Sequence, residues 1–143
     1  MSKKRKPKIE FRYYKMPEGS PILALLGQKW VQSYGRDVDY LHFHNYLEIG
    51  YCYAGEGTLT LGERDYRFTG GEISVIPRNY PHTTNSDPGT VSKWEYLFVD
   101  VDGLLEELYQ KGGNVKRMKY LQHRLNSQAI FREIEDAPGI AKM

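Results

Sequence analysis

Two separated stretches decide the fold of this chain: His42-Phe43-His44-Asn45-Tyr46-Leu47-Glu48, and the run from Gly71 to His82. Successive side chains of a β-strand point to opposite faces, so His42 and His44 are expected on one side of a strand. Glu48 has the same parity along the chain. A later strand that carries His82 across would bring three imidazoles and one carboxylate to a single point. Such a donor set suits a divalent metal, from iron to nickel or zinc.

The two stretches together resemble the paired motifs of the cupin superfamily. The first motif agrees in its His-x-His pair, in the three residues before Glu48 and in the six residues between Glu48 and Gly55. The second motif agrees at Gly71, Pro77 and His82. Asn79 stands where the superfamily usually has glycine. Asparagine is the residue that, after glycine, most readily adopts a left-handed backbone, so the departure is mild.

Within this superfamily, three segments look like the ligand-binding domain of AraC-family transcription regulators: residues 47–59, 71–77 and 94–100. The resemblance covers about residues 20–135. It implies an all-β double-stranded β-helix, the cupin or jelly-roll barrel, with a C-terminal pair of α-helices. It also implies that the barrel binds a small-molecule effector, such as a sugar or another metabolite, without a cofactor.

Regulators of this kind contact DNA through a C-terminal domain with two helix-turn-helix units. We expect that DNA-binding domain to be absent from this chain. The chain is then either a piece of a longer regulator or a stand-alone cupin.

Turn residues and hydrophobic periodicity divide the chain into three expected parts. Residues 1–10 are predicted to be a basic flexible arm, 11–102 the barrel and 103–136 a helical dimerisation and linker segment. The expected strands are 11–14, 23–31, 40–44, 48–54, 57–61, 66–69, 72–76, 82–85 and 94–99. Asp102 and Asn114 are candidate N-caps of two helices, the first ended by Gly112-Gly113 and the second running to about Glu135.

The resemblance allows three roles for His42, His44, Glu48 and His82. They bind a divalent transition metal, or they line an effector pocket as polar groups, or they are satisfied inside a wet core. Trp94 and Tyr96 share a strand face and match positions at which AraC-like domains contact effector. Ordinary core packing is the alternative for both aromatic residues.

The strand after Glu48 gives a hint about the space inside the barrel. Its even positions, Gly50, Cys52 and Ala54, are small, whereas its odd positions are bulky. If Glu48 points inward, small residues follow it there and leave room for a ligand. Cys52 itself is expected to be a buried apolar residue and not a nucleophile.

Met118, Leu121, Leu125 and Ala129 recur at three- and four-residue steps and form an apolar helical stripe. Such a stripe packs on its own barrel in most proteins. In AraC-like proteins a helix at this location commonly pairs two subunits, so we expect a homodimer.

Composition narrows the class of protein. The 143 residues suffice for one domain, and the net charge of +2 depends on Lys3, Lys4, Arg5, Lys6 and Lys8. A body without a basic face of its own is not expected to bind nucleic acid alone. One cysteine excludes an intramolecular disulfide, and no apolar run is long enough to cross a membrane. We therefore expect a cytoplasmic protein.

A small metal-dependent cupin enzyme, such as an oxygenase, isomerase or decarboxylase, is the rival to the regulator. There His42, His44, Glu48 and His82 would hold a metal that binds oxygen or polarises a carbonyl group.

Overall fold

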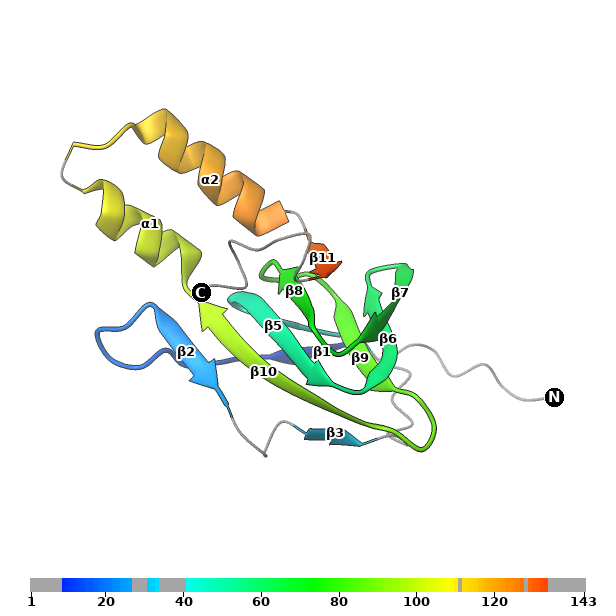
Figure 1. The fold of residues 1–143 in the computed structure, drawn as a ribbon. Helices are drawn as coiled ribbons and strands as arrows, with labels where there is room; N and C mark the ends of the chain where they lie inside the picture. The colour runs from blue at the N-terminus through cyan, green and yellow to red at the C-terminus, as the bar shows by residue number, and fades with distance from the viewer. Residues whose placement is uncertain (1–8, 27–30, 34–40, 111, 128, 134–143) are drawn as a thin grey trace.

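Two β-sheets face each other in the computed structural model, which describes residues 9–26, 31–33, 41–110, 112–127 and 129–133 (Figure 1). One sheet has the order β1 (Glu10–Arg12), β4 (His42–His44), β9 (His82–Ser86), β6 (Glu56–Leu61) and β7 (Arg64–Thr69). The other has the order β11 (Ile130–Glu133), β8 (Glu72–Ile76), β5 (Leu47–Ala54), β10 (Val91–Val99) and β2 (Ile22–Leu25), with β3 (Val31–Ser33) also paired to β10. This arrangement is the expected two-sheet cupin barrel.

The strands follow the predicted pattern of turns closely. β8 spans the predicted 72–76, and β5, β6, β9 and β10 contain their predicted ranges. The single strand predicted for 23–31 was wrong, because β2 and β3 are separate strands there. The basic run Lys3–Lys8 lies outside the described residues, and Glu10, assigned to the arm, begins β1 and pairs with His42.

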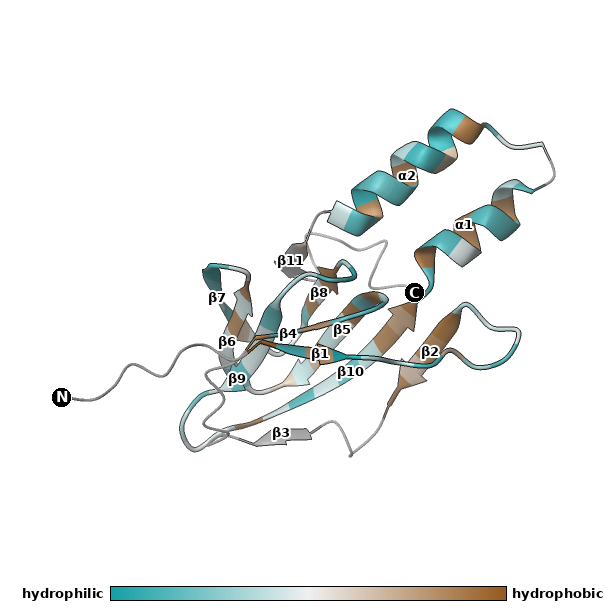
Figure 2. Cartoon of the chain, turned by 180° about the vertical axis from the view of Figure 1, so that it is seen from behind, coloured by the Kyte–Doolittle hydropathy of each residue, from teal (hydrophilic) through white to brown (hydrophobic). Residues whose placement is uncertain are grey.

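The core consists of two clusters on opposite sides of β5. Side chains of one parity, including Cys52, point between the sheets and pack with Trp94, Phe68 and Phe98. Ile49, of the other parity, packs outward in a second cluster beneath the helices. The hydropathy colouring follows the same division, with apolar segments in β5, β8 and β10 and mainly polar residues along the second helix (Figure 2).

Two helices, α1 (Val101–Tyr109) and α2 (Val115–Ser127), lie side by side at one end of the sheets (Figures 1 and 2). Asn114 caps α2 as predicted, because its Oδ1 accepts hydrogen bonds from the amides of Lys116 and Arg117. The cap predicted for α1 was wrong. Asp100, not Asp102, accepts from the Gly103 amide at 3.1 Å. Within the residues described, neither helix has the length and apolar character needed to span a membrane.

The chain returns to the sheet after α2, which corrects the prediction of a helix running to Glu135. The helix ends at Ser127, and Ile130–Glu133 forms β11, which pairs antiparallel with β8. Without β11 the backbone of β8 would present an open edge on the side away from β5. Isoleucine and phenylalanine favour strands, so pairing with this edge overrides the helical periodicity of the segment.

Candidate functional site

Three strands bring the predicted cluster together at one end of the barrel. β4 supplies His42 and His44, β5 supplies Glu48, and β9 supplies His82, which pairs across the sheet with His42. One nitrogen or oxygen atom from each of the four side chains lies within 4.8 Å of the others. His44, Glu48 and His82 are buried, and His42 is partly buried.

The carboxylate of Glu48 holds the centre of this group, which we call the His/Glu cluster. Its Oε2 lies 2.8 Å from Nε2 of His44 and 3.4 Å from Nε2 of His82. The two Nε2 atoms are 3.2 Å apart. Three buried atoms that can each offer a lone pair, Glu48 Oε2 and the two Nε2 atoms, therefore face one another.

The other ring nitrogens decide which groups face the centre. Nδ1 of His44 donates to the carbonyl oxygen of Tyr46 at 3.0 Å, and Nδ1 of His82 donates to the carbonyl oxygen of Tyr80 at 2.8 Å. With hydrogen on both Nδ1 atoms, each Nε2 offers a lone pair to the centre unless it carries a second proton. Lone pairs on His44, His82 and Glu48 would repel one another, so a proton or a cation must lie among them. Backbone carbonyls that orient imidazoles in this way are typical of metal-binding histidines, and the residues fit a divalent metal.

Burial and charge act in opposite directions on this cluster. Burial alone would raise the pKa of Glu48, but the nearby imidazoles of His82 and His44 outweigh it and hold the pKa below its ordinary value. Burial, followed by repulsion from His82 and Arg12, lowers the pKa of His42 to about 3. The cluster thus favours an ionised carboxylate and a neutral His42 at neutral pH.

A tyrosine from the segment after β1 covers one side of the cluster. The Tyr14 ring stacks on Phe98 at a centroid distance of 4.2 Å and meets His44 edge-on at 5.9 Å. Asn45 holds Tyr14 at two points, because its Oδ1 accepts from the Tyr14 amide at 2.9 Å and its Nδ2 donates to the Tyr14 carbonyl at 3.0 Å. Burial and the charge of Glu48 raise the pKa of Tyr14. Sequence reasoning did not assign a site role to Tyr14 or Asn45, since no local pattern links positions 31 residues apart.

Trp94 and Tyr96 lie inside the barrel and not on an open binding face. Only 2% of Trp94 and 8% of Tyr96 is exposed, and their rings are nearly parallel at 5.9 Å. The indole Nε1 of Trp94 is the one buried side-chain nitrogen or oxygen without a hydrogen-bond partner in the described part of the chain. Contact with an effector stays a prediction for both residues.

The space beside Gly50 is filled and gives no support to the expected opening. A Cβ atom at Gly50 would lie 2.6 Å from Ser74 Oγ, 3.2 Å from Tyr96 Cε1 and 3.3 Å from Trp94 Cε3. Gly50 thus makes room for neighbouring side chains. Ala54, also expected to face the interior, is exposed.

The apolar stripe of α2 packs largely within its own chain. Met118, Leu121 and Leu125 contact the cluster around Val101 beneath the helices. The prediction that Ala129 continues the helical stripe was wrong, because Ala129 follows the end of α2 and contacts the core between the sheets. All four remain partly exposed, so their role in dimerisation stays a prediction.

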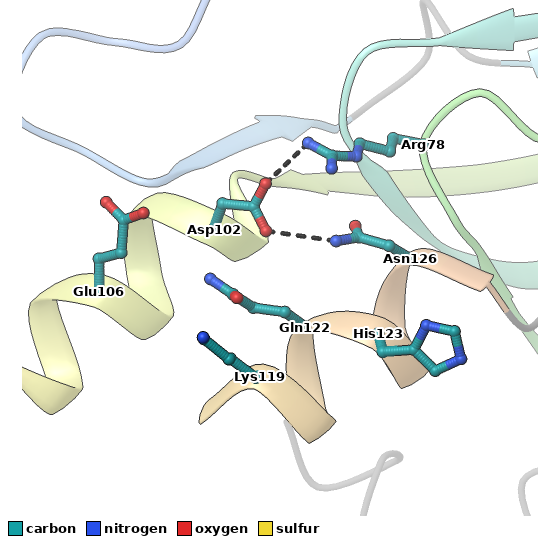
Figure 3. Close-up of a pocket in the computed structure, with 7 residues that line it drawn as sticks. All are labelled: Arg78, Asp102, Glu106, Lys119, Gln122, His123 and Asn126. Atoms are coloured by element: carbon teal, nitrogen blue, oxygen red, sulfur yellow. Dashed lines mark hydrogen bonds and ion pairs between the residues drawn. The ribbon is translucent and has the colours of Figure 1, made fainter. Parts of the chain in front are cut away.

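An open cleft of about 580 Å³ lies outside the barrel, where the two helices meet the turn after β8 (Figure 3). Its lining residues are Arg78, Asp102, Glu106, Lys119, Gln122, His123 and Asn126. No local sequence pattern predicts this cleft, because its residues come from three separate segments.

Comparison with known families decides the identity of the domain. Residues 32–138 match the family described as the AraC-like ligand binding domain. The chain belongs to this family. In this AraC-like ligand-binding domain, the His-x-His pair, Glu48 and His82 form the His/Glu cluster. Comparison with curated protein sequences gave no match.

Solved structures with a similar course of the chain include a cupin 2 conserved barrel domain protein from Leptotrichia buccalis. It is 19% identical, with a TM-score of 0.43 over 61% of this chain and 44% of that one. Unsaturated fatty acid bound ToxT from Vibrio cholerae is 12% identical, with a TM-score of 0.42 over 71% of this chain and 38% of ToxT. Another ToxT structure is 9% identical, with a TM-score of 0.43 over 86% of this chain and 54% of ToxT. This AraC-like domain therefore spans less than two thirds of each of these proteins.

Proposed function

We propose that this chain is the effector-sensing half of an AraC-like transcription regulator and that the His/Glu cluster is its recognition site. The observation that supports this most directly is the convergence of His44, Glu48 and His82 in a buried position. Buried polar groups cost free energy unless they are satisfied, and here His44, Glu48 and His82 satisfy one another through contacts that a bound ligand or cation can replace. The cluster therefore selects a small molecule rich in hydroxyl or amino donors, such as a sugar, or a divalent cation.

Sensing requires that the ligand favour one arrangement of the domain over another. In the proposed regulator the domain pairs with a second copy through the helices, in the cytoplasm. It passes its state to a DNA-binding domain of helix-turn-helix type. The effector shifts the balance between the two arrangements only because it binds one of them more tightly than the other.

A thermal-shift screen of metabolites and divalent metals tests the proposed site. A ligand at 100 times its dissociation constant stabilises the folded state by about 2.7 kcal/mol, which raises the melting temperature by roughly 10 °C. We expect at least one compound to do this for the wild type and to lose its effect in Glu48→Gln. Glu63→Gln, an exposed glutamate in the turn after β6, is the matched control. Compounds that shift all three proteins equally would contradict recognition at the cluster.

A metal-dependent cupin enzyme is the second candidate, and the carbonyl-oriented imidazoles favour it. His42, His44, Glu48 and His82 would hold the metal, which would supply Lewis-acid or redox chemistry when bound. Elemental analysis of the purified protein tests the enzyme candidate. The enzyme requires stoichiometric iron, manganese, nickel or zinc that is lost in His82→Ala, whereas a metal content far below stoichiometry contradicts it.

A further inference from the structure

The five-residue turn Pro77–Pro81 connects the His/Glu cluster to the helix pair. It lies between β8 and β9, and its successive residues contact opposite sides. On the cluster side, the Asn79 amide donates to the carbonyl oxygen of His44 at 2.8 Å, and the Tyr80 carbonyl accepts from Nδ1 of His82 at 2.8 Å. The turn thus orients the imidazole of His82 and holds the backbone of His44.

The side chain between these contacts points to the helices. Arg78 Nη1 lies 2.7 Å from Asp102 Oδ2, in the first turn of α1. Asp102 Oδ1 also accepts a hydrogen bond from Asn126 Nδ2 of α2 at 3.2 Å. Figure 3 shows both interactions meeting at the one carboxylate, which joins the turn, α1 and α2.

The turn is stiff and α2 has few buried contacts. A small movement of His82 can therefore be passed through the turn to the helix. Asn79 has a φ of 61°, and prolines stand at both ends, so the turn has little freedom to absorb a movement of His82. None of the residues of α2 is fully buried. A helix with so few buried contacts depends more on polar contacts such as that of Asn126, and it belongs to the less stable part of a fold.

We propose that the turn Pro77–Pro81 couples the state of the His/Glu cluster to the packing of α1 and α2. Arg78 is the positioning residue, and it acts through its ion pair with Asp102 of α1. This coupling rests on the proposed function, because it supplies the route by which a bound effector changes the helix pair. Coupling between two sites is reciprocal, so a change at Asp102 must be felt at the cluster.

Hydrogen exchange in the ligand-free protein tests the coupling in both directions. Asp102→Asn removes the charge that holds Arg78, and we expect the Asn79 amide to exchange about fivefold faster or more. Arg78→Gln should give the same change while leaving the helices' own residues intact. In the reverse direction, His82→Gln should accelerate exchange of the amides in α2.

Arg67→Gln is the matched control, because it breaks another exposed ion pair, to Asp87, at the β7 edge of the first sheet. A merely structural role for Arg78 would leave Asn79 unchanged, since isolated exposed ion pairs contribute little to stability. Wild-type exchange at Asn79 in both Asp102→Asn and Arg78→Gln, or unchanged α2 exchange in His82→Gln, would overturn the proposal.

Titration with Co²⁺ separates this coupling from the proposed function. If the cluster binds Co²⁺, the dissociation constant should rise about fivefold or more in Asp102→Asn and not in Arg67→Gln. An equal constant in all three proteins argues against the coupling. A wild type that binds no Co²⁺ contradicts metal binding at the cluster, and the exchange measurements then decide the coupling alone.

Discussion

Replacing Gly50 by alanine tests whether the interior beside the His/Glu cluster is filled. The added Cβ would lie 2.6 Å from Ser74 Oγ and would press against Tyr96 and Trp94 at 3.2 and 3.3 Å. These neighbours are themselves buried in the core. They cannot move away without disturbing the packing around them, because protein interiors are close-packed.

Two effects of the substitution oppose each other. Overpacking of a core by one methyl group costs about 1–3 kcal/mol. Alanine also restricts the unfolded chain, which stabilises the protein by about 0.4–1 kcal/mol. We therefore expect Gly50→Ala to lower the free energy of unfolding by about 1–2 kcal/mol. With a urea slope of about 2 kcal/mol per molar, the midpoint should fall by roughly 0.5–1 M.

Urea unfolding followed by circular dichroism provides the measurement, and Ser74 provides the control. Removing the Ser74 hydroxyl takes away the nearest atom, so Gly50→Ala combined with Ser74→Ala should cost less than the sum of the single changes. A Gly50→Ala protein that is as stable as the wild type, or more so, would refute the reasoning. The space beside Gly50 would then be open, as the small residues of this strand first suggested.

Three further expectations follow from single contacts. Cys52 is fully buried and burial raises its pKa to about 11, so a thiol reagent should label the folded protein far more slowly than the urea-unfolded chain; equal rates would contradict its burial. Asn45→Ala removes both hydrogen bonds to Tyr14 and should lower the free energy of unfolding by about 1–3 kcal/mol, and Asn45→Asp should have an intermediate effect. If Asn45→Ala left the free energy of unfolding unchanged, other contacts would hold Tyr14 in place. Burial lowers the folded-state pKa of His42 to about 3, below its unfolded value of about 6.5, so the unfolded chain binds the proton first. Stability in chelator-treated protein should therefore decline as the pH falls from 6.5 toward 3, with a smaller decline in His42→Gln; an equal decline in both would assign it to other groups.

The sequence predicted those features of the site that depend on short spacings. His42, His44 and Glu48 lie within seven residues of one another, so strand parity places them on one face. The left-handed backbone of Asn79 was likewise predictable from its residue type. The cupin resemblance supplied the long-range partner, His82, which parity alone could not identify.

Features that depend on distant parts of the chain were not predictable in this way. Asp102 has the side chain of an N-cap, but it bonds Arg78 and Asn126 while Asp100 caps the helix. The segment after Ser127 continues a helical apolar pattern, yet it pairs with β8, because tertiary pairing with an open strand edge overrides the local helical preference. The filling of the space beside Gly50 depends on three other strand positions, which no local pattern reveals.

Nuclear magnetic resonance of the imidazole nitrogens tests the recognition site most directly. We expect the free protein to have protonated Nδ1 atoms on His44 and His82, held by the carbonyls of Tyr46 and Tyr80. A compound that stabilises the protein should then shift the Nε2 resonances of both residues and leave exposed His123 unchanged. Nε2 resonances that stay fixed at saturation with every stabilising compound would contradict recognition at the His/Glu cluster.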